Sequence, residues 1–141
     1  MTGGNAETNP LFLPCGDAAL SVEFGRHVDA RLNALALELD AALCASRPEG
    51  LVETVPTYRA LMVQFDPLAT DHDAIESAIR ALLPDLAGKA KTPRRWQVPV
   101  VYGGDFGIDL ETLAERHGMS PSTLIDRHAG AVYTVAMLVY T

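Results

Sequence analysis

Residues 51–65 read LVETVPTYRALMVQF, and this stretch decides the fold because it holds two strand-like runs joined by a short turn. The runs are residues 51–55 and 60–65. The turn between them, residues 56–59, starts with a proline, which favours a turn over a continued strand. The stretch therefore predicts an antiparallel hairpin.

A second pair of strand-like runs lies upstream, in residues 11–13 and 18–24. In the later run the apolar residues alternate with polar ones, as in a strand with one buried face; they are Leu20, Val22 and Phe24. Between the runs, residues 14–17 contain proline, glycine and aspartate, which are typical of a tight turn. This region predicts another hairpin.

A helix is expected after each hairpin. Apolar residues recur at intervals of three and four over residues 28–44 and again over 71–83, which indicates two amphipathic helices. Thr70 and Asp73 are placed to form a weak capping box on the second. The order strand, strand, helix, strand, strand, helix predicts an α+β fold, a small ferredoxin-like antiparallel sheet with two helices on one face.

A boundary is expected after the second helix. Residues 84–95 are basic and punctuated by proline and glycine, so they predict a linker between domains at residues 1–90 and 91–141. Charge supports the division, because residues 1–88 hold 5 basic and 13 acidic residues, net −8, whereas residues 89–141 hold 6 and 5, net +1.

The second half predicts two strands, residues 96–102 and 131–140, separated by a glycine-rich turn and two short helices. Asp109 and Ser120 are expected to cap the N-termini of these helices. Residues 113–125 also resemble a helix-turn-helix, but the second helix offers only Arg127 as a permanent cation for contacts to DNA. A structural helical hairpin is therefore favoured.

Composition excludes several classes of protein. The net charge of −7 and the pI near 4.9 oppose general nucleic-acid binding. A hydrophobic content of 48% supports a folded core, and the sequence has no apolar run of membrane-spanning length. The N-terminus lacks the pattern of a signal peptide, so a cytoplasmic protein is expected.

Cysteines and histidines give little sign of metal chemistry. Cys15 and Cys44 lack CxxC spacing, so reduced, buried thiols are expected. No two histidines share the spacing of metal ligands, so no metal site is predicted. His27 and His72 flank helix starts and are expected to be solvated.

Four segments together resemble one known family. They are CGDAAL at 15–20, VEFG at 22–25, VPTYRAL at 55–61 and PVVYGGDFGIDL at 99–110. The family is that of the B subunit of bacterial 5-oxoprolinase, also called allophanate hydrolase subunit 1, which includes the Kip-type inhibitors of sensor kinases and belongs to the carboxyltransferase subdomain C and D proteins.

The resemblance implies an N-terminal α+β domain followed by a cyclophilin-like β-barrel that begins near Trp96. It also implies a related partner subunit and a third subunit, which together open 5-oxoproline to glutamate at the expense of ATP. ATP would belong to the complex, and no cofactor is assigned to this chain. Inhibition of a sensor histidine kinase, or a biotin-linked carboxyltransferase role as in urea carboxylase, are the alternatives.

The chain departs from the family pattern at two points. Ile108 stands where members usually carry proline, and the family continues into further barrel strands where this sequence ends at Thr141. We expect the incomplete barrel to leave the final strand pairing with a neighbouring chain or with the first domain.

The resemblance assigns no catalytic residue, and it marks surface candidates for binding or for an interface. They are Asp17, Tyr58, Arg59, Tyr102, Asp105, His117 and His128. For each of them a structural role is the competing interpretation. Asp17 and Asp105 lie in expected turns, Tyr58 and Arg59 in a connector, and the two histidines at helix ends, where the helix dipole favours imidazolium.

Overall fold

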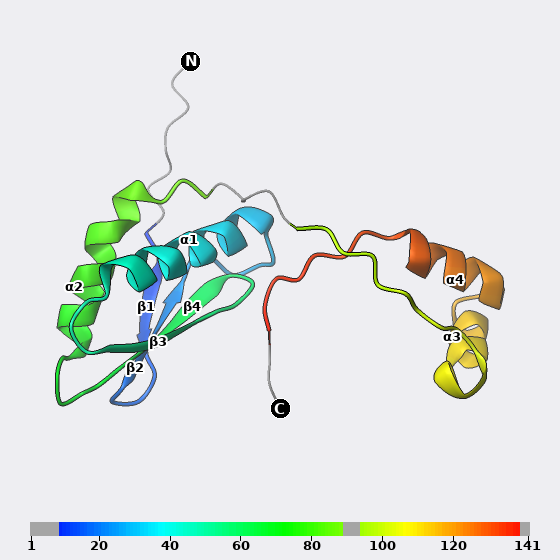
Figure 1. Cartoon of the computed structure of the whole chain (residues 1–141), viewed down its shortest axis with the longest axis horizontal. Helices are drawn as coiled ribbons and strands as arrows, with labels where there is room; N and C mark the ends of the chain where they lie inside the picture. Colours follow the sequence, from blue (N-terminus) through cyan, green and yellow to red (C-terminus); the bar gives the residue numbers. More distant parts are fainter. Residues whose placement is uncertain (1–8, 89–93, 139–141) are drawn as a thin grey trace, which may run out of the picture. The chain divides into compact units, whose positions relative to one another are not determined.

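The computed structural model describes residues 9–88 and 94–138, which fall into two compact units (Figure 1). Of the described residues, unit 1 comprises 9–88 together with 136–138, and unit 2 comprises 94–135. Within the described residues, unit 1 contains the sheet and two long helices, and unit 2 contains a short helical pair.

The sheet of unit 1 has four antiparallel strands in the order β1-β2-β4-β3. The strands are β1 (Leu11–Pro14), β2 (Ala19–Glu23), β3 (Leu51–Pro56) and β4 (Ala60–Phe65). Both predicted hairpins are confirmed, since β1 pairs with β2 and β3 pairs with β4. Strand β2 also pairs with β4, so the two most regularly alternating strands occupy the centre.

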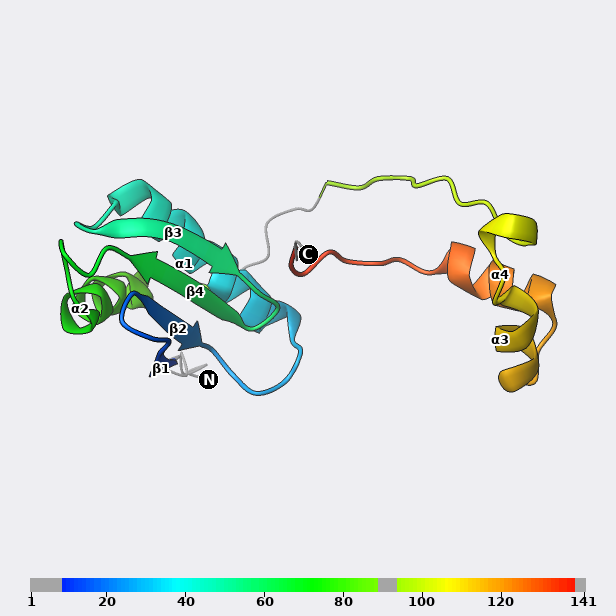
Figure 2. The same cartoon turned by 90° about the horizontal axis from the view of Figure 1, so that it is seen from below.

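Helices α1 (Ala30–Ser46) and α2 (His72–Leu82) lie on the same face of the sheet (Figure 2). The inward-facing residues of β2 and β4 pack against them and form the core. Its fully buried large side chains are Leu20, Val22, Leu39, Leu43, Leu61, Val63, Ile75 and Ile79. The predicted α+β fold, with a covered sheet face, is thus confirmed.

Aspartates begin both long helices. The Asp29 carboxylate accepts from the backbone N–H groups of Arg31 and Leu32, and Asp71 accepts from Ala74. The predicted capping box of Thr70 and Asp73 is therefore wrong, because the N-cap residue is Asp71, one position after Thr70, and it accepts from the Ala74 N–H at 2.8 Å. A single 3₁₀ turn, η1 (Leu83–Asp85), follows α2.

Unit 2 contains a 3₁₀ turn, η2 (Gly104–Phe106), and helices α3 (Leu110–Arg116) and α4 (Pro121–Gly130). Ser120 caps α4 as predicted, because its hydroxyl accepts from the Thr123 N–H at 3.1 Å. Asp109 does precede α3, but its side chain makes no capping hydrogen bond. That part of the prediction is wrong.

The two strands predicted for the second half are not formed in the described residues. Residues 96–102 and 131–138 are extended but form no strand, and the last two residues of the second prediction lie outside the described residues. Both segments are largely exposed; Trp96 and Val98 are 73% and 75% exposed. A strand needs a hydrogen-bonded neighbour, and the described part of unit 2 supplies none. Any cyclophilin-like barrel therefore stays a prediction.

Two expectations about individual side chains are also wrong. Cys15 and Cys44 are free thiols but exposed rather than buried, because Cys15 lies in the β1–β2 turn and Cys44 lies near the end of α1, at the open depression beside Thr54 of β3. His72 is half-buried rather than solvated, with Nε2 3.1 Å from the Ala19 carbonyl oxygen and its ring edge-on to Phe65. Among the described helices, none has the length and apolar character needed to cross a bilayer.

Candidate functional site

Two of the residues selected from sequence, Tyr102 and His128, meet in unit 2. The Tyr102 hydroxyl oxygen lies 2.6 Å from His128 Nδ1, and the two rings are edge-to-face with centroids 5.6 Å apart. Tyr102 directly precedes the glycine turn, and His128 lies in the last turn of α4. The fold thus joins two residues 26 positions apart.

Tyr133 completes this group, and the sequence reasoning did not select it. Its ring centroid is 5.5 Å from that of His128, and its hydroxyl donates to the His128 carbonyl oxygen at 3.4 Å. The one signal in the sequence was an aromatic residue soon after the glycine that ends α4. We call Tyr102, His128 and Tyr133 the His128 cluster.

The His128 cluster holds an imidazole in a defined orientation. The roles within the Tyr102–His128 bond depend on the tautomer: an unprotonated Nδ1 accepts from the hydroxyl, and a protonated Nδ1 donates to the hydroxyl oxygen. In both cases Nε2 takes no part in this bond, so the cluster can present one imidazole nitrogen to a ligand or partner, which suits recognition or proton transfer.

The glycine turn beside the cluster has the backbone conformation that glycine alone adopts easily. Gly103 and Gly104 have φ of 78° and 56°, in the left-handed region. Asp105 and Phe106 form the exposed turn itself, with Phe106 N–H bonded to the Gly103 carbonyl at 3.3 Å. Within the described residues, no side-chain interaction joins Asp105 to the His128 cluster. Asp105 is therefore better described as a turn residue than as part of that cluster.

His117, the other candidate histidine, ends α3. Its backbone N–H is bonded to carbonyls of the last helical turn, including those of Leu113 and Ala114 at 3.2 Å. These backbone bonds are typical of a helix C-terminus, and the imidazole ring of His117 is not in the His128 cluster. His117 is thus placed as a C-cap residue.

Tyr58 and Arg59 form a separate group in unit 1, at the β3–β4 turn. Arg59 Nη1 donates to Glu23 Oε2 and to the Gly25 carbonyl, both at 2.7 Å, and its guanidinium lies 5.8 Å from the Tyr58 ring centroid. The hydrogen bond to Glu23 raises the pKa of Arg59 above its usual value. These hydrogen bonds connect the β3–β4 turn to the end of β2, which gives the Arg59 guanidinium a structural role.

Asp17 lies apart from this group. It is exposed in the β1–β2 turn, beside the start of β2, whereas Glu23 and Arg59 meet at the end of that strand. The strand register pairs Ala19 with Gln64 and Glu23 with Ala60, so the two turns lie at opposite ends of β4. Asp17 is thus a turn residue without a described site around it.

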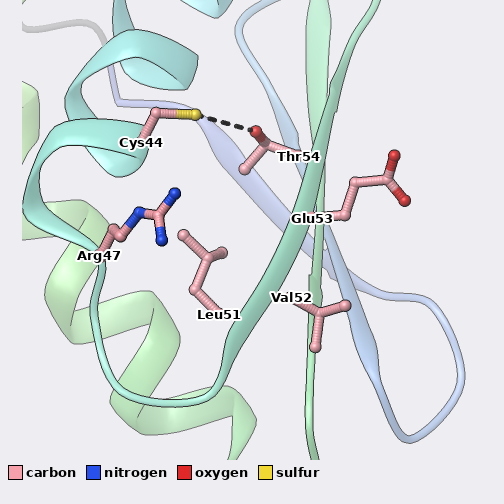
Figure 3. Close-up of a pocket in the computed structure, with 6 residues that line it drawn as sticks. All are labelled: Cys44, Arg47, Leu51, Val52, Glu53 and Thr54. Carbon is pink, nitrogen blue, oxygen red and sulfur yellow. Dashed lines mark hydrogen bonds between the residues drawn. The ribbon is translucent and has the colours of Figure 1, made fainter.

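The depression in Figure 3, between α1 and β3, holds none of the sequence-selected residues. Its volume is about 150 Å³, which is below the size of typical small-molecule sites. Its lining residues are Cys44, Arg47, Leu51, Val52, Glu53 and Thr54. Thr54 Oγ1 donates to Asp40 Oδ1 at 2.5 Å beside it, which gives this polar edge a structural role. Among the described residues, no group of three or more potential ligands is arranged to hold a metal ion.

The short hydrogen bond of the His128 cluster can be tested directly. Replacing Tyr102 by Phe keeps the ring and removes the hydroxyl, so we expect unit 2 to lose about 0.5–1 kcal/mol of stability. The His128 Nδ1 shift, measured by nitrogen NMR, should change more than the Nε2 shift, because Nδ1 loses its hydrogen-bond partner. Tyr133→Phe is the matched comparison and should change both quantities less, because its bond is 3.4 Å long. If Tyr102→Phe and Tyr133→Phe change the stability and the nitrogen shifts equally, the short Tyr102–His128 hydrogen bond is not formed.

Solved structures similar to this chain include the uncharacterized protein PH0987 from Pyrococcus horikoshii. It is 32% identical with a TM-score of 0.51, over 86% of this chain and 56% of that one. The protein TTHA0988 is 30% identical with a TM-score of 0.66, over 83% of this chain and 22% of that one. Both similar proteins have longer chains, because the matched region is 56% of one and 22% of the other.

Curated relatives point to one family. The chain is 29% identical over 135 residues to the B subunit of 5-oxoprolinase from Bacillus subtilis (strain 168), covering 87% of this chain and 56% of the relative. It is 30% identical over 90 residues to the protein of the same name from Haemophilus influenzae, covering 64% and 42%. The chain thus spans about half the length of these relatives. Because the model of the carboxyltransferase domain, subdomain C and D, matches residues 10–141, the chain belongs to that family.

Proposed function

We propose that this chain acts as the B-type component of an ATP-dependent 5-oxoprolinase complex. The observation that carries the proposal is the agreement of the family match over residues 10–141 with two relatives that are both named as the B subunit of 5-oxoprolinase. The partners in this proposal are a related subunit of the C type and a third subunit. The complex would be cytoplasmic, where its ATP is supplied.

ATP is proposed to bind elsewhere in the complex. The sequence contains no P-loop and no other glycine-rich phosphate-binding motif of known spacing. The contribution we assign to this chain is the His128 cluster, which offers a hydrogen-bonded imidazole at an exposed position of unit 2. An imidazole in that setting suits contact with a substrate carbonyl, a carboxylate or a partner surface.

The C-terminal segment is the proposed contact to a partner. Val132, Tyr133 and Val135 are 86%, 68% and 77% exposed, and the residues from 131 onward carry no charged side chain. Exposed apolar backbone without a paired strand is stabilised when another chain adds a strand to it. We therefore propose that the exposed residues 131–135 pair with another subunit.

The test is reconstitution with the products of the neighbouring genes. We expect 5-oxoproline-dependent ATP hydrolysis only when all subunits are present, and at least a tenfold loss with His128→Ala in this chain. His27→Ala is the matched control, because His27 is exposed and lies in unit 1. ATP hydrolysis that is unchanged when this chain is omitted contradicts the proposed function. If the complex stays fully active with His128→Ala, the proposed role of the His128 cluster is wrong, whereas the proposed function of the chain still stands.

A second candidate function follows from the family description itself, which names a carboxyltransferase domain. In that case the partner is a biotin carrier protein, and the complex transfers a carboxyl group. Co-purification of a biotinylated protein with the chain, together with no turnover of 5-oxoproline, distinguishes this candidate. Inhibition of sensor-kinase autophosphorylation by the chain alone is the outcome that identifies a regulatory role instead.

A further inference from the structure

The Asn33 side chain, near the start of α1, bonds to two other parts of unit 1: the β3–β4 turn and the C-terminal segment. Asn33 Nδ2 lies 3.0 Å from the Thr57 carbonyl oxygen and 3.0 Å from the Ala136 carbonyl oxygen. Ala136 belongs to the same compact unit as Asn33. One carboxamide therefore connects positions 103 residues apart in the chain.

The carboxamide nitrogen is suited to this task because it carries two protons. Each proton serves one carbonyl, so both donors of the group are used. A carboxylate of the same size has no proton to offer, and a hydroxyl has only one. The side chain at this position thus needs the amide chemistry specifically.

The turn holds Asn33 ready for an extended segment. Thr57 is fixed by three hydrogen bonds to Ala60: its N–H and its hydroxyl donate to the Ala60 carbonyl at 2.8 and 3.0 Å, and its hydroxyl accepts from the Ala60 N–H at 3.2 Å. Because the position of the Thr57 carbonyl is fixed, the hydrogen bond to it orients the Asn33 carboxamide. The second N–H of Nδ2 is then directed at the adjacent backbone, here the Ala136 carbonyl.

Burial along the C-terminal segment changes at this contact. Residues 131–135 are exposed, whereas Ala136 and Met137 are half-buried. The bond made there is to a backbone carbonyl, so it recognises an extended main chain rather than a particular side chain. We propose that Asn33 and the β3–β4 turn form a docking site for an extended backbone and that the chain at Ala136 and Met137 is its occupant.

The variant that tests this site is Asn33→Asp, which keeps the shape and replaces the donor by an acceptor. It places two carbonyl oxygens against a carboxylate, so the segment should leave. Unit 1 should stay folded, because position 33 is the fourth residue of α1 and a carboxylate near a helix N-terminus is favourable. Asn9→Asp is the matched control, since it makes the same charge change at an exposed residue.

Limited proteolysis of the full chain by thermolysin reports release of the segment. Cleavage within residues 134–138, identified by mass spectrometry, should become about fivefold faster in Asn33→Asp than in the native chain, as expected for loss of one hydrogen bond. Asn9→Asp should match the native rate. A rate in Asn33→Asp within twofold of Asn9→Asp overturns the proposal.

A measurement on the native chain decides the question independently of any variant. The Asn33 side-chain amide protons should show nuclear Overhauser contacts to Ala136, whose carbonyl oxygen lies 3.0 Å from Asn33 Nδ2. Their presence supports the docking site even where Asn33→Asp fails to fold. Their absence in a spectrum that shows a folded α1 overturns it.

Discussion

Replacing Leu61 by Ala should lower the free energy of unfolding of unit 1 by about 3–4 kcal/mol. Leu61 is completely buried on β4, the strand that lies between β2 and β3 in the sheet, and it belongs to the core that α1 and α2 cover. Truncation removes the transfer free energy of the side chain and leaves a cavity that close-packed neighbours fill only in part. Domains of this size are stable by about 5–15 kcal/mol, so the loss is large.

Urea unfolding followed by far-ultraviolet circular dichroism measures this change. Leu68→Ala is the matched control, because Leu68 is 96% exposed and its truncation should change stability by less than about 0.5 kcal/mol. If both leucine variants unfold at the same urea concentration, Leu61 does not lie in a packed core.

Gly50→Ala should destabilise unit 1 by about 2–3 kcal/mol, through two separate effects. Gly50 has φ of +77°, and the left-handed conformation costs a residue with a Cβ about 1–2 kcal/mol. The added Cβ would also lie 2.5 Å from Thr70 Cγ2 and 2.9 Å from Thr70 Cβ. The backbone has little room to shift, because the Gly50 carbonyl accepts from the Asp66 N–H at 2.8 Å.

Gly16→Ala separates the two effects. Gly16 also has a left-handed φ, +70°, but a Cβ there meets nothing within 4 Å. It should therefore show the conformational cost alone, and the double variant Gly50→Ala with Thr70→Ser should recover part of the difference by removing Cγ2. Equal losses for Gly16→Ala and Gly50→Ala would show that Thr70 moves aside without cost.

The sequence was most informative about unit 1, where local patterns and tertiary packing agree. Alternation in residues 18–24 and the three-and-four spacing after residue 28 each describe a face that the core buries. The cap of α2 was misassigned because Thr70, Asp71 and Asp73 all can cap a helix, and only the backbone entry angle selects Asp71.

The second half was less predictable because strands depend on partners. Residues 96–102 and 131–138 have the composition of strands, but a strand exists only where another one bonds to it, and composition does not supply the neighbour. The helices α3 and α4 form from local signals, including the Ser120 cap and the proline after it, so they were predicted correctly.

The sequence named the candidate residues one by one and did not indicate which of them meet in the fold. Tyr102 and His128 were both named, yet nothing in a linear spacing of 26 positions indicates that they bond, and Tyr133 was missed altogether. Arg59 was a candidate for binding or for an interface, but in the fold its guanidinium forms an ion pair with Glu23. A side chain's role depends on which donor or acceptor reaches it, and that is a property of the folded chain.

By itself, the amino-acid sequence determined the order of elements in unit 1, which face of each is apolar, and the family resemblance, because these depend on short-range periodicity and on motifs. The tertiary structure alone decided which residues meet: Tyr102 with His128, Arg59 with Glu23, and Asn33 with both Thr57 and Ala136. Such contacts join residues 24 to 103 positions apart, so they arise only when the sheet and helices have packed.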